Sequence, residues 1–172
     1  MNEQIMDSYD YMKVTVDEEM CSRYMDDYQK FGWKIDENVS SEKSMGKVTL
    51  HMKRNRHIVN KVELTRLQRH YESCMEEIRI LENSKSSVPT MASISCGLAG
   101  CVFITGSVFA VTNTPPVIWL MVLLAIPGFF LWAAAYFSYG LVKRKRTIKV
   151  DPLIEAKYDE ADEVCGKAWK LL

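Results

Sequence analysis

Apolar and polar residues alternate along two short stretches near the N-terminus. Every second residue is apolar in YMKVTV (11–16) and in KVTLHMK (47–53), and this pattern predicts half-buried strands. In residues 17–32 the apolar positions recur instead at helical spacing. Acids stand at the start of that stretch and Gly32 at its end, so it predicts a helix. WKIDENV (33–39) predicts a further strand.

The order strand, helix, strand, strand predicts a small α+β (β-α-β-β) unit with a short antiparallel sheet, over residues 1–58. A unit of this size buries only a marginal core. We therefore expect it to pack on another part of the chain.

Two polar segments carry apolar residues at the alternating 3-4 spacing of coiled-coil-like helices. One is residues 59–87, and the other lies in 143–172, where Asp151 is the predicted N-cap and Pro152 the first helical residue. The simplest arrangement pairs the two helices within one chain; a homo-oligomeric coiled coil is the alternative. The predicted helix-seam residues are Leu64, Leu67, Tyr71, Cys74, Ile78, Leu81, Ile154, Tyr158, Ala161, Cys165 and Ala168.

The chain has 172 residues, of which 26% are charged, yet residues 86–142 contain no Asp, Glu, Lys, Arg or His. Two apolar runs in this region, 88–112 and 117–142, are each long enough to cross a hydrocarbon core of about 30 Å as a helix. The polar VTNTPPV between them predicts an extracytoplasmic turn at 113–116. The predicted fold class is thus a membrane α-helical hairpin with two transmembrane helices, the α+β unit and two membrane-proximal helices.

Flanking charge predicts the orientation of the two spans. KRKR (143–146) follows the second run directly, and Arg79 and Lys85 precede the first, whereas the gap between the runs is uncharged. The positive-inside rule then places both termini in the cytoplasm. The predicted localisation is multi-pass in the cytoplasmic (inner) membrane, with the α+β unit as a cytoplasmic domain.

Small residues recur every fourth position along the first run and predict a close helix–helix contact. The neighbour is expected to be the protein's own second span, with self-association as the alternative. Pro127 and Gly128 predict a kink in the second span. The predicted transmembrane packing residues are Ser93, Gly97, Gly100, Cys101, Gly106 and Ala110.

Basic residues gather in 47–61, which contains no acid, and again after the second run. They could attract anionic lipid headgroups; ordinary positive-inside charge is the alternative. Nucleic-acid binding is not expected, because the patch lacks aromatic residues for stacking. The predicted lipid contacts are Lys53, Arg54, Arg56, Lys143, Arg144, Lys145 and Arg146.

The sequence contains few candidate residues for a metal site or a catalytic site. The five cysteines are odd in number and form no CxxC pair, which is typical of reduced packing cysteines. His70 and Cys74 lie four apart and could donate two metal ligands, but Cys74 already belongs to the seam. Because no hydrolase, P-loop or dinucleotide motif occurs, we predict no catalytic residue, no metal site and no cofactor.

Four stretches, FGWKIDENV, LTRLQRHYESCMEEIRILENSK, VFAVTNTPPVIWLMVLLAIPGFF and EVCGKAWKLL, resemble a family of uncharacterised two-span membrane proteins of Gram-positive anaerobic bacteria. The resemblance covers nearly the whole chain. It implies the two-span topology and assigns no activity, ligand or catalytic residue.

The sequence therefore predicts a non-enzymatic integral membrane protein. Protein–protein interaction through its cytoplasmic domain is the expected mode of action, as an accessory or regulatory subunit or a scaffold. Its partners would be the lipid bilayer and a protein, or a second copy of itself. One alternative is a small oligomeric channel or transporter component, and another is a membrane-bound enzyme of unknown reaction.

Overall fold

The computed structural model describes residues 8–112 and 116–172. The chain divides into two compact units. The first, the sheet unit, comprises the described part of Met1–Glu76 together with Lys157–Leu172. The second, the apolar unit, comprises the described part of Glu77–Ala156. The predicted turn at 113–116 lies outside the described residues except for Pro116.

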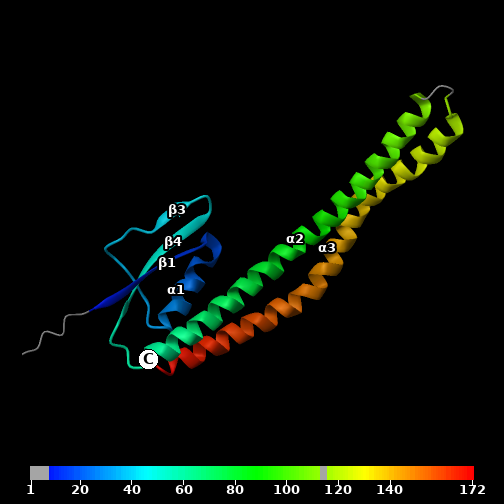
Figure 1. The fold of residues 1–172 in the computed structure, drawn as a ribbon. Helices are drawn as coiled ribbons and strands as arrows, with labels where there is room; N and C mark the ends of the chain where they lie inside the picture. Colours follow the sequence, from blue (N-terminus) through cyan, green and yellow to red (C-terminus); the bar gives the residue numbers. More distant parts are fainter. Residues whose placement is uncertain (1–7, 113–115) are drawn as a thin grey trace, which may run out of the picture. The chain divides into compact units, whose positions relative to one another are not determined.

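The sheet unit is built on four antiparallel strands (Figure 1). Strand β4 (Lys47–Asn55) is central and pairs along its whole length with β1 (Tyr9–Asp17). On its other side β4 pairs with β2 (Lys34–Ile35) and β3 (Glu42–Ser44). The two strands predicted by alternation, β1 and β4, are confirmed. The strand predicted at 33–39 is much shorter than expected.

Strand β3 was not predicted, because its sequence had only the features of a turn. It is followed by Met45 and Gly46, which have φ angles of 49° and 75°. Two consecutive positive φ angles are the geometry of the tight hairpin turn that matches the twist of paired strands. The turn-rich sequence around Gly46 therefore holds both a strand and the turn that leads into β4.

The predicted N-terminal helix is confirmed as a short 3-10 turn, η1 (Glu18–Met20), continuing into α1 (Cys21–Gln29). Gly32 ends this segment with a φ of 83°, and its N–H donates to the carbonyl of Gln29 at 2.9 Å. A Cβ at Gly32 would also stand 2.8 Å from the side chain of Ile58. The positive φ favours glycine there, and a larger residue would also have to displace the end of the Ile58 side chain.

The core of the sheet unit lies between β4 and the helices. Val48, Leu50 and Met52, which alternate along β4, are buried. They share this core with α1 and with the part of helix α2 (Lys61–Thr112) that belongs to the sheet unit. Aromatic side chains fill it, with the ring centroids of Phe31 and Tyr71 5.6 Å apart.

Two reciprocal hydrogen bonds fasten α1 to α2. Tyr71 on α2 donates to Asp27 on α1 at 2.9 Å, and Tyr28 on α1 donates to Glu72 on α2 at 3.0 Å. Adjacent residues on each helix thus supply one donor and one acceptor. Burial is the main cause that raises the pKa of both tyrosines. Both therefore remain hydrogen-bond donors at neutral pH.

Helices α2 and α3 (Ile118–Trp169) are each continuous over 52 residues. The prediction that Asp151 and Pro152 begin a separate helix is therefore wrong, since Pro152 lies inside α3. The carboxylate of Asp151 pairs with Lys85 at 2.8 Å instead of capping a helix. Each helix contains an apolar segment long enough to cross a membrane.

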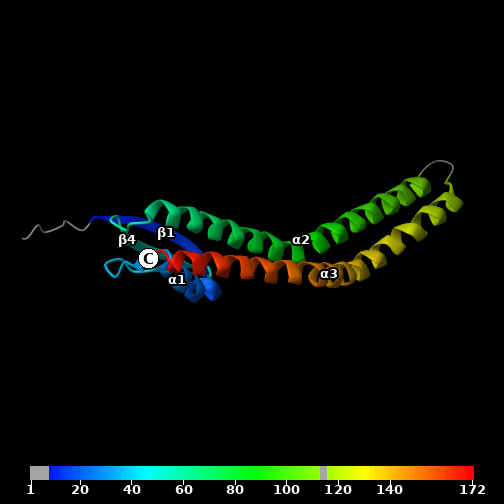
Figure 2. The same ribbon diagram turned by 90° about the horizontal axis from the view of Figure 1, so that it is seen from below.

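In the apolar unit, side chains of α2 meet the backbone of α3. Ser107 donates to the carbonyl of Met121 at 3.0 Å, and Cys96 to that of Leu131 at 3.4 Å. Both views show these segments side by side (Figure 2). A Cβ added at Gly128 would stand 2.8 Å from Ile104, so the helices approach closely where glycine removes the side chain.

Candidate functional site

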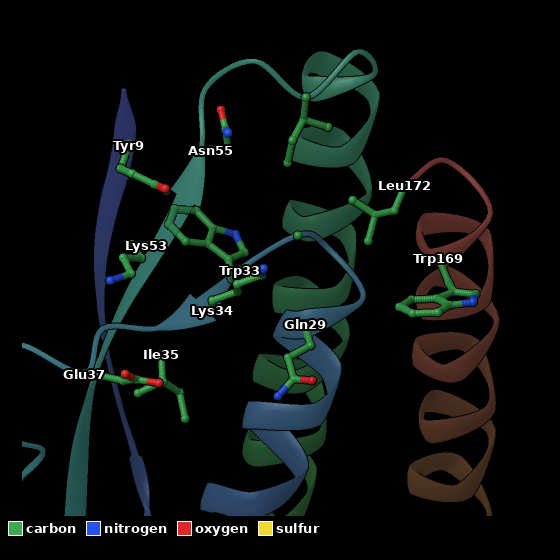
Figure 3. Close-up of a pocket in the computed structure, with 12 residues that line it drawn as sticks. Tyr9, Gln29, Trp33, Lys34, Ile35, Glu37, Lys53, Asn55, Trp169 and Leu172 are labelled. Atoms are coloured by element: carbon green, nitrogen blue, oxygen red, sulfur yellow. The ribbon is translucent and has the colours of Figure 1, made fainter. Parts of the chain in front are cut away.

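The sheet unit contains a half-open groove of about 780 Å³ at the ends of β1, β2 and β4 (Figure 3). This volume falls within the range of about 300–1,000 Å³ typical of ligand sites. The chain's C-terminal residues close one side of it. We call it the aromatic groove, and its main lining residues are Tyr9, Trp33, Ile35, Lys53, Trp169 and Leu172.

Trp33 forms a rigid wall of the groove. Its indole N–H donates to Oε1 of Gln68 at 2.8 Å, which holds the ring in place. The guanidinium of Arg54 stacks on the ring, with Cζ 4.5 Å from the ring centroid. The opposite wall is different, because Trp169 is 64% exposed. The groove thus combines one fixed indole with one that is available for contact.

Arg54 is only 5% exposed, and burial lowers the pKa of its guanidinium. Its Nη2 donates weakly to Thr65 at 3.4 Å. Within the described part of the chain, its Nε and Nη1 have no hydrogen-bond partner. The prediction that Arg54 contacts lipid headgroups is therefore wrong, because its guanidinium lies beneath the wall of the groove rather than on a surface.

The other predicted basic contacts of the sheet unit are paired with acids from distant parts of the sequence. Lys53 lies 3.0 Å from Asp36, and Arg56 lies 2.7 Å from Asp10. Hydrogen bonding to Lys53 is the main cause that lowers the pKa of Asp36. The acid-free stretch 47–61 is thus partly neutralised by the fold.

The basic cluster in the apolar unit, residues 143–146, is mostly exposed. Lys143, Arg144 and Lys145 are exposed, whereas Arg146 is partly buried and donates to Ser84 at 3.3 Å. Lipid contact by the exposed members of this cluster stays a prediction.

Most predicted seam residues are buried; only Leu81 and Tyr158 are partly exposed. Contacts join the two helices within one chain, since His70 on α2 is hydrogen-bonded to Glu160 on α3 at 2.8 Å. Tyr71 also packs against α1, which the sequence did not predict. Tyr158 lies beneath the guanidinium of Arg23 at 4.2 Å.

The predicted transmembrane packing residues separate into two groups. Gly100 and Ala110 are buried, and a Cβ at Gly100 would stand 2.5 Å from Trp132 on α3. Gly106 is in ordinary contact range of Leu124, at 3.5 Å. Cys101 is exposed, Ser93 and Gly97 are partly exposed, and a Cβ at Gly97 would meet no atom within 4 Å. Gly100, Gly106 and Ala110 thus form the group that faces α3, and Ser93, Gly97 and Cys101 form the open group.

Sequence reasoning missed the groove residues Tyr9, Trp33 and Trp169 as a site. They come from β1, from the loop after Gly32 and from the end of α3, and no local motif connects them. Of the described residues, those that line the groove include no Ser, Cys or His. The groove is suited to burying an apolar or aromatic group. Polar contacts with such a group could come from the lining residues Lys34, Glu37 and Asn55.

A second group of side chains lies outside the groove. His70 on α2 is hydrogen-bonded to Glu160 on α3 at 2.8 Å, and Cys74 is close to both. These residue types could hold a metal ion.

Comparison with protein families, with curated proteins and with solved structures finds no match to this chain.

Proposed function

We propose that the protein is an integral membrane protein whose two spans form a helical hairpin. The spans are supported by the exposure of their apolar segments, of which only 17% and 6% of the residues are buried. A core helix of a soluble protein would be mostly buried. Exposing so large a continuous apolar surface to water is energetically unfavourable, whereas contact of the same surface with lipid is not. Residues 86–142 also contain no Asp, Glu, Lys, Arg or His.

In the proposed topology the two spans lie in the cytoplasmic membrane and both termini lie in the cytoplasm. Basic residues follow the second span and precede the first, which favours this orientation. The sheet unit would then be cytoplasmic, and the turn at 113–116 would be the extracytoplasmic part.

A cysteine at position 113 tests this topology. In a variant without its native cysteines, Asn113→Cys should react with a membrane-impermeant maleimide added to intact cells. The matched variant Lys170→Cys should react only after the cells are opened. The reverse pattern would overturn the orientation, and reaction of both positions in intact cells would overturn the cytoplasmic sheet unit.

We further propose that the protein acts by binding a protein partner in the aromatic groove, as an accessory subunit or scaffold at the membrane. The observation that carries this is the exposed Trp169 opposite the fixed ring of Trp33. Interfaces concentrate their binding energy in aromatic and arginine residues that are held in place before binding. The occupant would be a segment with an apolar or aromatic anchor.

A photoreactive amino acid at Trp169 tests the binding function in native membranes. We expect one defined protein adduct at this position, and loss of that adduct when Ile35→Glu is added, because a buried carboxylate opposes apolar contact. The control position is Val62, which is exposed in the sheet unit but does not line the groove. Identical adducts from both positions, or none from Trp169, would contradict the proposal.

A further inference from the structure

A cluster of three potential metal ligands joins α2 to α3 within the sheet unit. The donor atoms of His70, Cys74 and Glu160 all lie within 4.8 Å of one another. We infer that these three side chains bind a divalent transition-metal ion of the zinc type. This site is separate from the aromatic groove, and it does not depend on the function proposed for the groove.

The donor set determines the class of ion. A thiolate and an imidazole are ligands of Zn²⁺ and Co²⁺, and a carboxylate completes sites of this kind. Ca²⁺ and Mg²⁺ require oxygen ligands throughout, so they do not fit. Binding converts the Cys74 thiol to a metal-bound thiolate, and its proton is released to water.

The backbone already holds the ligands near the required geometry. His70 and Cys74 are one helical turn apart on α2, and Glu160 reaches them from α3. Bond lengths of about 2.0–2.3 Å place tetrahedral ligand atoms around zinc roughly 3.4–3.6 Å apart. The hydrogen bond between His70 and Glu160, now 2.8 Å, must therefore open by about 0.6 Å to admit the ion.

The burial of the three side chains also favours a metal site. Cys74 is 1% exposed and lies on the inner side of the cluster, whereas the side chains of His70 and Glu160 are 50% and 38% exposed. The two outer ligands can adjust their rotamers without disturbing the core. With three protein ligands, a fourth position on the exposed side is left for water or for a ligand from outside.

Lys157 helps to orient the carboxylate. Its ammonium lies 2.8 Å from Oε2 of Glu160, while Oε1 faces His70. One oxygen is thus held by an ion pair and the other is directed toward the cluster. Outer partners of this kind orient the groups that bind the metal.

Co²⁺ is the probe that distinguishes this site from an ion pair beside a packed cysteine. The full chain, purified in detergent micelles and freed of metal by a chelator, is titrated with Co²⁺. We expect one equivalent to bind with a thiolate-to-cobalt charge-transfer band in the near ultraviolet and tetrahedral visible bands. Added Zn²⁺ should displace it and abolish both.

Matched variants locate the ion. His70→Gln and Glu160→Gln change exposed side chains, so they should leave the fold intact, and each should weaken Co²⁺ binding by more than about a hundredfold, beyond the 10–100-fold cost of losing an outer partner. Cys74→Ser should remove the charge-transfer band. The controls His57→Gln, Asp159→Asn and Cys101→Ser should bind as the unchanged chain does.

Three results would overturn the site. The first is the absence of a thiolate band in the unchanged chain. The second is a band that survives Cys74→Ser. The third is unchanged affinity in both His70→Gln and Glu160→Gln, which would leave the cluster as an ordinary ion pair.

Discussion

Replacing Gly128 with valine is expected to destabilise the packing of α2 against α3 in the apolar unit by about 1–3 kcal/mol, the usual cost of overpacking. A Cβ at this position would stand 2.8 Å from Cγ1 of Ile104 and 3.3 Å from Cβ of Phe103. Neither atom is at the far end of a flexible side chain, so the helices must move apart. Detergent-driven unfolding of the full chain in mixed micelles measures this free energy.

Glycines that face no neighbour supply the controls. Gly140→Val, also on α3, adds a side chain where no atom lies within 4 Å, and Gly97→Val does the same on α2. Valine has a higher helix propensity than glycine, so these variants should be unchanged or slightly more stable. If Gly97→Val instead destabilises as much as Gly128→Val, the open group of α2 is the packed one, as self-association would require.

The same glycines show that the sequence alone does not predict which small residues pack against the neighbouring helix. Small residues at four-residue spacing indicated a close helix contact on the first span, but two rows satisfied that spacing equally well. Only three-dimensional packing distinguishes the buried Gly100 from Gly97. Gly128 was interpreted as part of a kink, although its position against Ile104 makes it a packing residue.

Local sequence patterns predicted the individual strands of the sheet unit better than the contacts between its elements. Alternation in 47–53 identified β4, and the buried Leu50 and Met52 follow from it. The groove could not be predicted in this way, because β1, the loop after α1 and the end of α3 each contribute to it. Periodicity describes one element at a time, and it contains no information on which elements meet.

The pairing of charges was not predictable for the same reason. The stretch 47–61 contains no acid and was interpreted as a patch that could attract anionic headgroups, with ordinary positive-inside charge as the alternative. Asp36 and Asp10 are distant in sequence, yet they pair with Lys53 and Arg56. The burial of Arg54 beneath Trp33 is likewise a property of the fold and not of the local sequence.

Tyr71→Ala is expected to lower the stability of the sheet unit by about 3–5 kcal/mol, the range for removing a large buried aromatic side chain. Tyr71 is fully buried and contacts the rings of Tyr28 and Phe31. Hydrogen exchange of the Leu50 and Met52 amides, followed in the full chain, should accelerate roughly a hundred- to a few-thousandfold at 1.4 kcal/mol per tenfold. Tyr11→Ala, which changes an exposed tyrosine on β1, is the control and should have little effect.

Tyr71→Phe separates the hydrogen bond from the ring. It keeps the aromatic packing but removes the donor to Asp27, whose side chain is nearly fully buried and is also paired with Lys30 at 2.8 Å. A hydrogen bond to a charged group is worth about 1.5–3 kcal/mol, so this variant should fall between the unchanged chain and Tyr71→Ala. Exchange as slow as in the unchanged chain would mean that Lys30 and Arg23, which lie 2.8 and 3.7 Å from Asp27, satisfy the carboxylate without Tyr71. Exchange as fast as in Tyr71→Ala would mean that the reciprocal tyrosine–carboxylate pairs, rather than apolar packing, hold α1 on α2.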